Sequence, residues 1–525
     1  MRTQTEPILH ETAGLSECLD RLASQKSRFV PGATYRLQFN GEFGFRHAKE
    51  IVPYLHALGI TTCYASPLLQ ARTGSLHGYD ITDHNKLNAE IGTEEEFREL
   101  TDELHARGMS LLLDVVPNHM GVGHGGNPWW QDILENGRTS KYANFFDIDW
   151  DPLKPELHNK VLLPILGAQY GEELETGRLV LQYEDGKFLI RYYEKVLPLD
   201  PHTIPLVFEP LGDLGSSAAV RELQSLLVAF TELPPHDTGE IDRANKRQRE
   251  IPFLKQRLKD LVERSPEIRE IIERAIKKLN GIPGDPRSYD AMHKLLEAQS
   301  YRLAHWRVSG EEINYRRFFD INDLVGLRME DPVVFAATQK LIRRLLADGC
   351  VQGLRIDHPD GLFNPPQYLT RLQMLYAASQ CYGAEPRGPQ AENGIELDVQ
   401  TVFGQHEWVR SRAPLYVLVE KVLEPGEQLP EPWQVDGTVG YDFTNLVNGV
   451  FIDTRNRKAF TAFYHRFIGG AIDVDTLIYD SKKLIMTVIS EYVDVAHAFY
   501  DKRESGFVNG LLDAIAKEAG PARTQ

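Results

Sequence analysis

The sequence predicts an α/β fold of the (β/α)8 TIM-barrel type, with about six of the eight strand–helix units and a large insertion after the third strand. Short apolar runs alternate with amphipathic segments, which indicates a parallel sheet with crossover helices. The runs are almost unbroken, as expected of strands buried on both faces. Polar residues follow several runs directly, at the strand ends that carry the active site in TIM barrels.

The first three strands are expected within residues 31–120, the first part of the barrel. The helix at 93–108 has the clearest signals, because Thr93 can cap it, acidic residues fill its first turn and Gly108 follows its end. The predicted elements are strands at 32–39, 60–69 and 109–119 and helices at 45–59 and 93–108.

An inserted subdomain is expected at 121–305, where the alternation of strand and helix breaks. It contains aromatic loops, short strand-like pieces and a highly charged helical segment at 242–280, whose charges predict a solvated face rather than a partner site. The aromatic residues predict either the core of this insertion or the closing wall of a ligand pocket. They are Trp129, Trp130, Phe145, Phe146 and Trp150.

The alternation resumes in residues 306–473, the second part of the barrel. The predicted elements are helices at 331–349 and 366–379 and strands at 350–358, 415–423 and 439–451. An N-terminal segment at 1–30 and a helical tail at 474–525 flank the barrel.

The composition points away from polyanionic partners. Lys and Arg number 58 against 75 Asp and Glu, a formal charge of −17, which disfavours binding to nucleic acid or to anionic membranes. The four cysteines form no C-x-x-C pair, which argues against a disulfide framework or a zinc site. We expect a cytoplasmic protein, because no signal peptide or membrane-spanning run is recognisable.

Polar side chains collect at the carboxyl ends of three predicted strands. An open doubly wound sheet binds ligands at the same edge, but no glycine-rich nucleotide loop is present. Singly, each residue could be structural, as a turn residue, an ion pair or a core histidine; together they predict a site. They are Asp114, Asn118 and His119, then Arg355, Asp357 and His358, then Glu420 and Lys421.

Asp357 and Glu420 suggest paired-carboxylate chemistry on a glycosidic bond. Such a pair works as a nucleophile and a general acid, with carboxyl groups about 5–5.5 Å apart in retaining enzymes. Arg355 lies two residues before Asp357, on the same side of the strand, and is expected to keep it ionised. Glu420 should be partly buried, so that its pKa rises enough for proton donation.

The loop at 73–83 is a candidate sugar-binding element. His77 and Tyr79 offer a hydrogen bond and an aromatic face, which suit the hydroxyl edges and apolar faces of a sugar ring. Asp80 is a further candidate ligand in this loop. The structural alternative is a packed turn built on the loop's glycines.

Three motifs resemble the signature regions of the α-amylase superfamily of glycoside hydrolases: DVVPNH, GLRIDH and VEK. This resemblance implies that Asp357 is the nucleophile and Glu420 the acid/base. The matching substrate-site residues are Asp114, Asn118, His119, Arg355 and His358.

Other motifs resemble the maltooligosyltrehalose synthase family, over about residues 31–500. They are YRLQF, GSLHGYD, NPWWQDILENG, YANFFDIDW, YRRFFDINDLVGLR, LRIDHPDGL and GTVGYDFTN. The family consists of (1→4)-α-D-glucan 1-α-D-glucosylmutases, which implies a malto-oligosaccharide substrate, an intramolecular transglucosylation with retention and a closed pocket for the released glucose. Carboxylates suffice for this chemistry, so we expect no cofactor and no metal.

The chain departs from the family pattern in its last third. No stretch matches the fourth signature region, which carries a third carboxylate, and the last two strands are not recognisable. Because an open barrel exposes strand edges, we consider that a second polypeptide could complete it. The alternatives to a mutase are a non-catalytic α-glucan-binding fragment and an α-glucan hydrolase.

Overall fold

The computed structural model describes residue 22, residues 28–123, 126–383, 413–424 and 426–471, and residues 473, 476–479 and 481. Two compact units divide the chain, at residues 1–442 and 443–525. The predicted N-terminal segment and helical tail lie mostly outside the described residues. The domain boundaries at 30, 120, 305 and 473 stay predictions.

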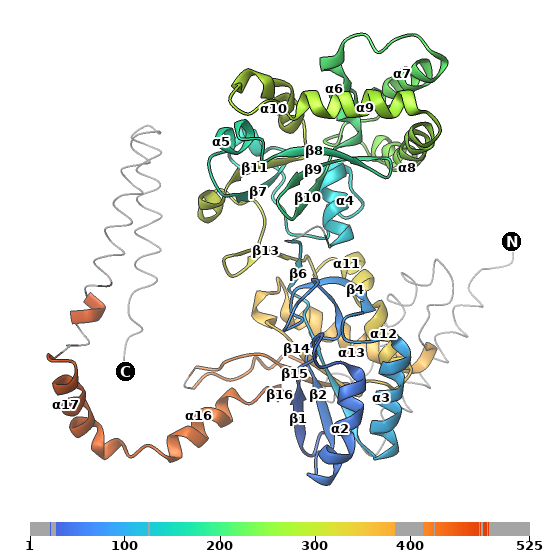
Figure 1. Ribbon diagram of the computed structural model, residues 1–525. Helices are drawn as coiled ribbons and strands as arrows, with labels where there is room; N and C mark the ends of the chain where they lie inside the picture. Colours follow the sequence, from blue (N-terminus) through green and yellow to red (C-terminus); the bar gives the residue numbers. More distant parts are fainter. Residues whose placement is uncertain are drawn as a thin grey trace, which may run out of the picture. The chain divides into compact units, whose positions relative to one another are not determined.

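A six-stranded parallel sheet forms the base of the first unit (Figure 1), in the order β1-β2-β5-β14-β15-β16. Every neighbouring pair is parallel, which confirms the prediction of an incomplete barrel with about six strand–helix units. The strands are β1 (Thr34–Leu37), β2 (Thr62–Ala65), β5 (Ser110–Val115), β14 (Gly353–Ile356), β15 (Tyr416–Val419) and β16 (Gly437–Thr438).

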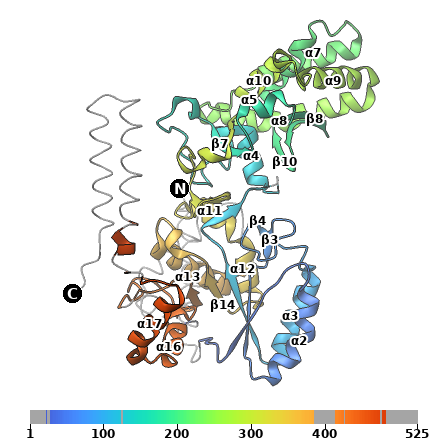
Figure 2. The same cartoon turned by 60° about the vertical axis from the view of Figure 1, so that its left-hand side comes forward.

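Crossover helices cover this sheet, and α2 and α3 lie side by side in two views (Figures 1 and 2). Helix α3 begins as predicted, because Thr93 accepts from the Glu96 N–H and the Glu96 carboxylate accepts from the Thr93 N–H. The single helix predicted at 331–349 is instead two helices that meet at Gln339. The helices are α2 (Phe45–Ala57), α3 (Glu94–Ala106), α11 (Pro332–Thr338), α12 (Lys340–Ala347) and α13 (Pro365–Tyr382).

The sixth strand is much shorter than the predicted 439–451. Strand β16 ends at Thr438, and Gly440 adopts a φ of 103°, which terminates extended backbone. Helix α16 (Tyr441–Val450) follows, with α17 (Arg457–Phe467) after it in the second unit. The aromatic and β-branched residues of this stretch favour a strand in the sequence, but they are exposed along a helix.

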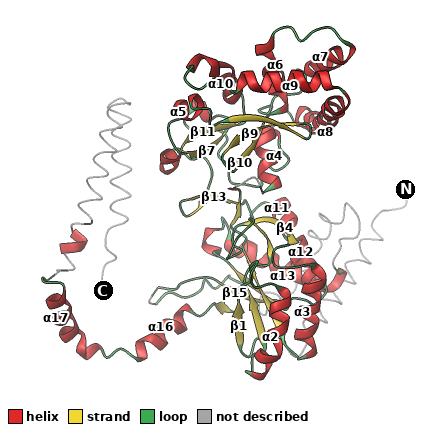
Figure 3. Ribbon diagram, viewed as in Figure 1, coloured by secondary structure: helices red, strands yellow, loops and turns green. Residues whose placement is uncertain are grey.

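The insertion combines two small sheets with a set of helices that gather on one side of them (Figure 3). Strands β8, β9 and β10 form an antiparallel meander, and β7 pairs with β11 in parallel. The strands are β7 (Val161–Leu166), β8 (Val180–Glu184), β9 (Lys187–Tyr192), β10 (Lys195–Pro198) and β11 (Tyr301–His305). The helices are α4 (Pro128–Asn136), α5 (Tyr170–Glu175), α6 (Ile204–Phe208), α7 (Ala218–Thr231), α8 (Ile241–Arg264), α9 (Pro266–Leu279) and α10 (Asp290–Glu297).

The aromatic residues of the insertion form core, which was the first of the two alternatives. Trp130, Phe145, Phe146 and Trp150 are buried, and Trp130 packs edge-on against Phe146 at 5.2 Å. Trp129 is partly buried and packs on Phe145. These side chains therefore build the insertion rather than an open pocket wall.

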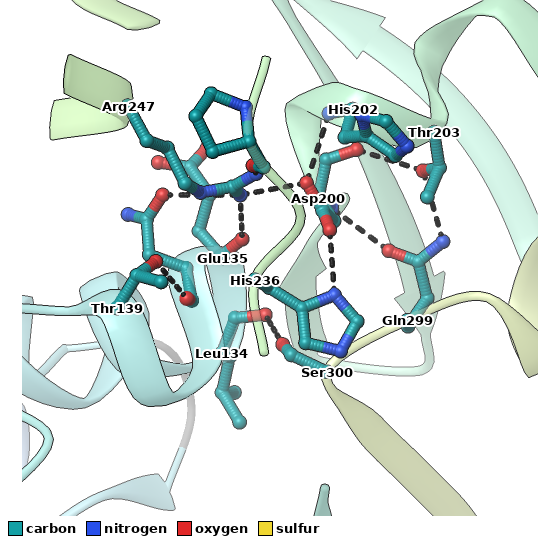
Figure 4. Close-up of polar contacts among 12 residues, drawn as sticks. Leu134, Glu135, Thr139, Asp200, His202, Thr203, His236, Arg247, Gln299 and Ser300 are labelled. Atoms are coloured by element: carbon teal, nitrogen blue, oxygen red, sulfur yellow. Dashed lines mark hydrogen bonds and ion pairs between the residues drawn. The ribbon is translucent and has the colours of Figure 1, made fainter. Parts of the chain in front are cut away.

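One charge of the predicted solvated face is buried. Arg247 of α8 is fully enclosed and donates to the Asp200 carboxylate at 2.7 Å. Figure 4 shows Asp200 at the centre of this group, with His236 at 2.8 Å and the backbone N–H of His202 on the same carboxylate. The group joins α8 to the chain just after β10.

A three-stranded sheet connects the insertion to the barrel. Strand β6 (His119–Gly121) pairs with β13 (Ile321–Gly326), which pairs in turn with β12 (Arg317–Phe318). Strand β6 follows β5 almost directly, so the β12–β13 hairpin is held at the carboxyl edge of the main sheet. A further pair, β3 (Leu69–Ala71) and β4 (Ile81–Leu87), encloses residues 72–80, so the last residues of the predicted 73–83 loop belong to β4.

Cys63 and Cys350 are free thiols, whereas Cys381 is disulfide-bonded, a cross-link that the cysteine spacing did not predict. Among the described residues, no helix is both long and apolar enough to cross a bilayer.

Candidate active site

The two carboxylates of interest follow neighbouring strands at the same edge of the sheet. The Asp357 N–H donates to the Val115 carbonyl at 2.9 Å, and the Glu420 N–H donates to the Ile356 carbonyl at 2.9 Å. The sheet ladder therefore extends through both residues. Their backbones are fixed by the same hydrogen bonds that hold the strands together.

Arg355 joins three carboxylates. Its guanidinium lies 2.8 Å from Asp114, 2.6 Å from Asp357 and 3.2 Å from Glu420. In the sheet register Arg355 stands opposite Asp114, so the ion pair crosses two neighbouring strands. Arg355, Asp114 and Asp357 are all buried, which strengthens their mutual attraction.

Asp357 and Glu420 contact each other through their carboxyl groups. Burial is the largest effect on the pKa of Asp357 and raises it. Arg355 lowers this pKa and the negative charge of Glu420 raises it, and together these effects give a pKa of about 7. Burial alone would raise the pKa of Glu420, but Arg355 and hydrogen bonds from Asp357 and the His358 N–H lower it. Two carboxyl groups in contact share one proton, and the proton belongs to the pair.

This arrangement differs from the prediction in two respects. The direct hydrogen bond places the carboxyl groups closer together than the expected separation of about 5–5.5 Å. The pKa shifts also run opposite to those expected. The physical reason is burial, because Asp357 is the more enclosed carboxyl group and its side chain is 7% exposed against 30% for Glu420.

Asp114 is held by two tyrosines as well as by Arg355. The hydroxyl of Tyr79 donates to it at 2.7 Å and that of Tyr64 at 3.1 Å. Burial still raises the pKa of Asp114 above its usual range, although Arg355 and these hydroxyls act in the opposite direction. The Arg355 guanidinium lies 5.9 Å from the centre of the Tyr79 ring.

The loop at 73–83 brings Tyr79 to the site and leaves His77 at its rim. The two rings stack at 6.0 Å, and His77 is exposed. Asp80 is directed to its own loop, since it accepts from the Ser75 hydroxyl and from Arg72 at 3.0 Å. The loop thus has features of both alternatives: a packed turn that presents an aromatic side chain.

Asn118 and His119 lie next to the other predicted site residues but face protein partners. The Asn118 side-chain oxygen accepts from Arg316 at 2.6 Å. His119 packs on Phe318 at 4.4 Å, with its Nε2 3.2 Å from the Tyr79 carbonyl. Burial lowers the pKa of His119 to about 3, so the imidazole is neutral.

His358 adopts a left-handed backbone conformation, with a φ of 43°. Its N–H donates to the Glu420 carboxylate at 3.1 Å, and its ring packs against Phe318 and Phe319. Lys421 is turned to other partners, because its ammonium pairs with Asp360 at 3.0 Å and with Glu427 at 3.1 Å.

Sequence reasoning missed four residues at this site. Tyr64 and Arg316 bind predicted site residues, Phe318 packs between His119 and His358, and the Tyr441 hydroxyl lies 3.4 Å from Glu420. Three of the four lie in the motifs YRRFFDINDLVGLR and GTVGYDFTN. The position of Tyr64 could have identified it, because it lies near the end of β2, opposite Leu112.

No group of three or more His, Cys, Asp and Glu side chains is arranged to hold a metal ion within the part of the chain that the structure describes. The predicted independence from metals and cofactors stays a prediction.

Comparison with known proteins places this geometry in a family. A family model described as the α-amylase catalytic domain matches residues 48–174. A putative maltooligosyl trehalose synthase from Mycobacterium tuberculosis (strain CDC 1551 / Oshkosh) is 30% identical over 437 residues, or 82% of this chain and 40% of that protein.

Two solved structures share the fold. The maltooligosyltrehalose synthase from Arthrobacter ramosus is 29% identical, with a TM-score of 0.57, over 86% of this chain and 43% of that one. A hypothetical maltooligosyl trehalose synthase from Sulfolobus tokodaii is 27% identical, with a TM-score of 0.55, over 89% of this chain and 46% of that one. The chain spans less than half the length of each of these relatives. Over the part of their length that it spans, the chain is similar to maltooligosyl trehalose synthases, and its residues 48–174 match the α-amylase catalytic domain.

Proposed function

We propose that this chain carries part of the active site of a glucosylmutase that acts on malto-oligosaccharides. The reaction converts the reducing-end α-1,4 bond into an α,α-1,1 bond with retention of configuration. The observation that carries the proposal is the contact between Asp357 and Glu420 at the carboxyl ends of neighbouring strands, with Arg355 bound to both.

Asp357 is the proposed nucleophile and Glu420 the proposed acid/base. An incoming sugar separates the two carboxyl groups, because their direct contact leaves no space for the anomeric carbon. Separation removes the like charge from Asp357 but leaves Arg355, which favours ionised Asp357 and moves the shared proton to Glu420. Glu420 is also the more exposed of the two, as a group that exchanges protons with substrate must be.

The reaction then takes two balanced steps. Asp357 forms a bond to the anomeric carbon while the glycosidic bond breaks, and Glu420 gives its proton to the departing glucose oxygen. The anomeric hydroxyl of that same glucose next attacks the glucosyl–Asp357 bond and returns its proton to Glu420. Water must be excluded in the interval, since its attack gives hydrolysis.

Three of the remaining predicted site residues, Tyr79, His358 and His77, are proposed sugar ligands. Tyr79 offers its ring beside Arg355, and His358 lies next to Glu420. His77 stands at the rim. Asp80, Asn118, His119 and Lys421 already bind protein groups, so we propose that they shape the cleft more than they bind hydroxyls.

Trapping the covalent intermediate tests this assignment. A 5-fluoro-glucosyl fluoride should label the wild-type chain on Asp357, as located by peptide mass spectrometry. The Glu420→Gln variant should still be labelled, because fluoride leaves without a proton, whereas Asp357→Asn should not. A label on Glu420, or in Asp357→Asn, would overturn the roles.

Products from maltopentaose distinguish the competing functions. A non-reducing pentasaccharide supports the mutase, and glucose with maltotetraose supports an α-glucan hydrolase. Binding in calorimetry with no trapped label under any condition supports a non-catalytic α-glucan-binding protein.

A further inference from the structure

Arg316 lies immediately before β12 and ends in a ring of four oxygen acceptors. Its guanidinium donates to the Asn118 side-chain oxygen at 2.6 Å, the Leu327 carbonyl at 2.7 Å, the Gly361 carbonyl at 3.0 Å and Asp147 at 3.0 Å. These acceptors belong to four separate segments: the link between β5 and β6, the residue after β13, the turn after β14 and the insertion. One planar side chain therefore ties the β12–β13 hairpin to two predicted site segments.

Two glycines make room for this group. A Cβ atom on Gly326 would lie 2.5 Å from the Arg316 guanidinium carbon. A Cβ atom on Gly361 would lie 2.6 Å from the Asn118 side-chain oxygen and 2.4 Å from the His358 ring. All three distances are shorter than a real Cβ contact, so a side chain at either position would have to displace Arg316, Asn118 or His358.

Backbone hydrogen bonds around Arg316 link the same segments. The Arg316 N–H donates to the Asp147 carbonyl and the Gly326 N–H donates to the Arg316 carbonyl. The Leu327 N–H donates to the Asn118 carbonyl at 2.9 Å. The guanidinium is thus held in a fixed orientation at the edge of the main sheet.

The turn at 357–361, whose Gly361 carbonyl accepts from Arg316, is strained. His358 has a left-handed backbone, which a non-glycine residue adopts at a cost and keeps only when its surroundings impose it. The Gly361 N–H closes this turn on the His358 carbonyl at 3.1 Å, and Arg316 holds the Gly361 carbonyl. This turn directs the His358 N–H toward Glu420, and the N–H donates a hydrogen bond to the Glu420 carboxylate.

We propose that Arg316 is a positioning residue for the candidate active site. It clamps the 357–361 turn to the link between β5 and β6, and through the His358 N–H it fixes the orientation of Glu420. Its contribution to turnover rests on the proposed function of Glu420, whereas its clamping of the turn does not.

The test compares Arg316→Ala with Arg317→Ala. Arg317 is a matched control, because it has the same charge and lies in the same hairpin but bonds only within it, to Asn322 and to the Asp320 carbonyl. Hydrogen exchange of a peptide covering 357–362 should accelerate at least about tenfold in Arg316→Ala and stay unchanged in Arg317→Ala. Arg316→Lys should resemble Arg316→Ala, because an ammonium cannot reach four acceptors in one plane.

Chemical rescue separates a fitted guanidinium from general destabilisation. Guanidinium ion, at a non-denaturing concentration and against the same concentration of sodium salt, should restore slow exchange in Arg316→Ala alone. The rate of labelling by the glucosyl fluoride should fall about 10–100-fold in Arg316→Ala and recover in parallel, because small misplacements of catalytic groups cost this much.

Equal exchange rates in the wild-type and Arg316→Ala peptides would overturn the inference, as would failure of guanidinium to slow exchange. If the wild-type chain takes no label and binds no malto-oligosaccharide, the proposed function fails instead. The exchange experiment still decides the role of Arg316 in that case.

Discussion

Arg355 carries a single positive charge for three carboxyl groups, Asp114, Asp357 and Glu420. One cation cannot neutralise three buried or half-buried anions, so the site holds protons to higher pH than separate carboxylates do. Burial raises the pKa values of Asp114 and Asp357, and the single charge of Arg355 is too little to bring them back to the usual range. The electrostatics of the site thus leave one proton available between Asp357 and Glu420.

The stability of the protein should depend on this proton. Because the pKa of Asp357 rises to about 7 on folding, the native state binds the proton more tightly than the unfolded chain does. The free energy of unfolding should therefore fall as pH rises from about 4 through 7. Asp357→Asn, which cannot ionise, should be more stable than wild type at pH 8 by about 1–3 kcal/mol, and by much less at pH 5.

Urea unfolding at pH 5 and pH 8 measures this difference. Glu420→Gln is the matched control, because the lowered pKa of Glu420 gives it the opposite sign: its charge adds stability above pH 4.5, which the variant loses. A stabilisation by Asp357→Asn that is equal at both pH values would contradict the raised pKa.

Tyr79 supplies the shorter of two hydroxyl bonds to Asp114. Tyr79→Phe should lower the free energy of unfolding by about 1–3 kcal/mol, because a buried carboxylate loses a donor. Tyr64→Phe removes the longer bond and should cost less. Chemical denaturation of both variants and of the double variant measures the difference, and the reverse order would contradict the assignment of Tyr79 as the main donor.

Among the elements, the buried parallel strands were predictable and the segments that connect them were less so. Strands β5 and β14 are apolar runs with polar residues directly after them, a pattern that is typical of buried parallel strands whose carboxyl ends form a site. The stretch at 439–451 was misread because aromatic and β-branched residues also occur on helices, and only Gly440 marks the boundary. The two-helix break at Gln339 has no distinctive residue in the sequence.

The predicted site residues divide in the same way. Asp357 and Glu420 follow strands, so the sheet alone brings them together. Arg316 could not be placed from the sequence, because its acceptors at Asn118 and Gly361 lie far from it along the chain. Lys421 was predicted from its position after a strand, but loop carboxylates engage it.

Helix α8 depends on one buried ion pair. Arg247→Met should lower the free energy of unfolding by about 3–5 kcal/mol, because it leaves the enclosed Asp200 without its arginine. Lys246→Met is the matched control, since this neighbour is half-exposed and 3.9 Å from Glu250. Urea unfolding should show that the control loses no more than about 1 kcal/mol in its free energy of unfolding. Similar losses in both variants would contradict a structural role for the buried pair.

The same cluster predicts acid sensitivity of the insertion. Burial alone would raise the pKa of Asp200, but His236 and Arg247 bind its ionised form and lower the pKa below its usual range. The ionised carboxylate therefore adds stability above the pKa of the unfolded state, and this stability is lost as pH falls through the folded pKa. Hydrogen exchange in α8 should accelerate below about pH 4 in wild type. Asp200→Asn should show fast exchange at neutral pH as well. Exchange in this variant as slow as in wild type would contradict a role of the cluster in acid sensitivity.

At the scale of the whole molecule, the described sheet supplies the two proposed catalytic carboxylates and the residues that hold them, but the signature region that is expected to carry a third carboxylate is not recognisable in the sequence. In the proposed reaction that third group binds sugar hydroxyls as the ring flattens toward the transition state, and such contacts supply several kcal/mol. Because each ~1.4 kcal/mol is about tenfold in rate, its absence should slow turnover by roughly a thousandfold or more. In the described structure Asp442 accepts a hydrogen bond from Thr438.

We therefore expect the 525-residue chain by itself to form little or no non-reducing product from maltopentaose, while it still binds malto-oligosaccharide weakly through the Asp357–Glu420 half of the site. Product analysis by anion-exchange chromatography and binding by calorimetry measure the two parts of this prediction. Asp357→Asn is the control for turnover, because any residual product must disappear with the nucleophile. Addition of a polypeptide that corresponds to the remaining length of the relatives should restore turnover if a second chain completes the barrel. Turnover by the chain alone at the rate of a full-length synthase would show that the chain supplies its own third group.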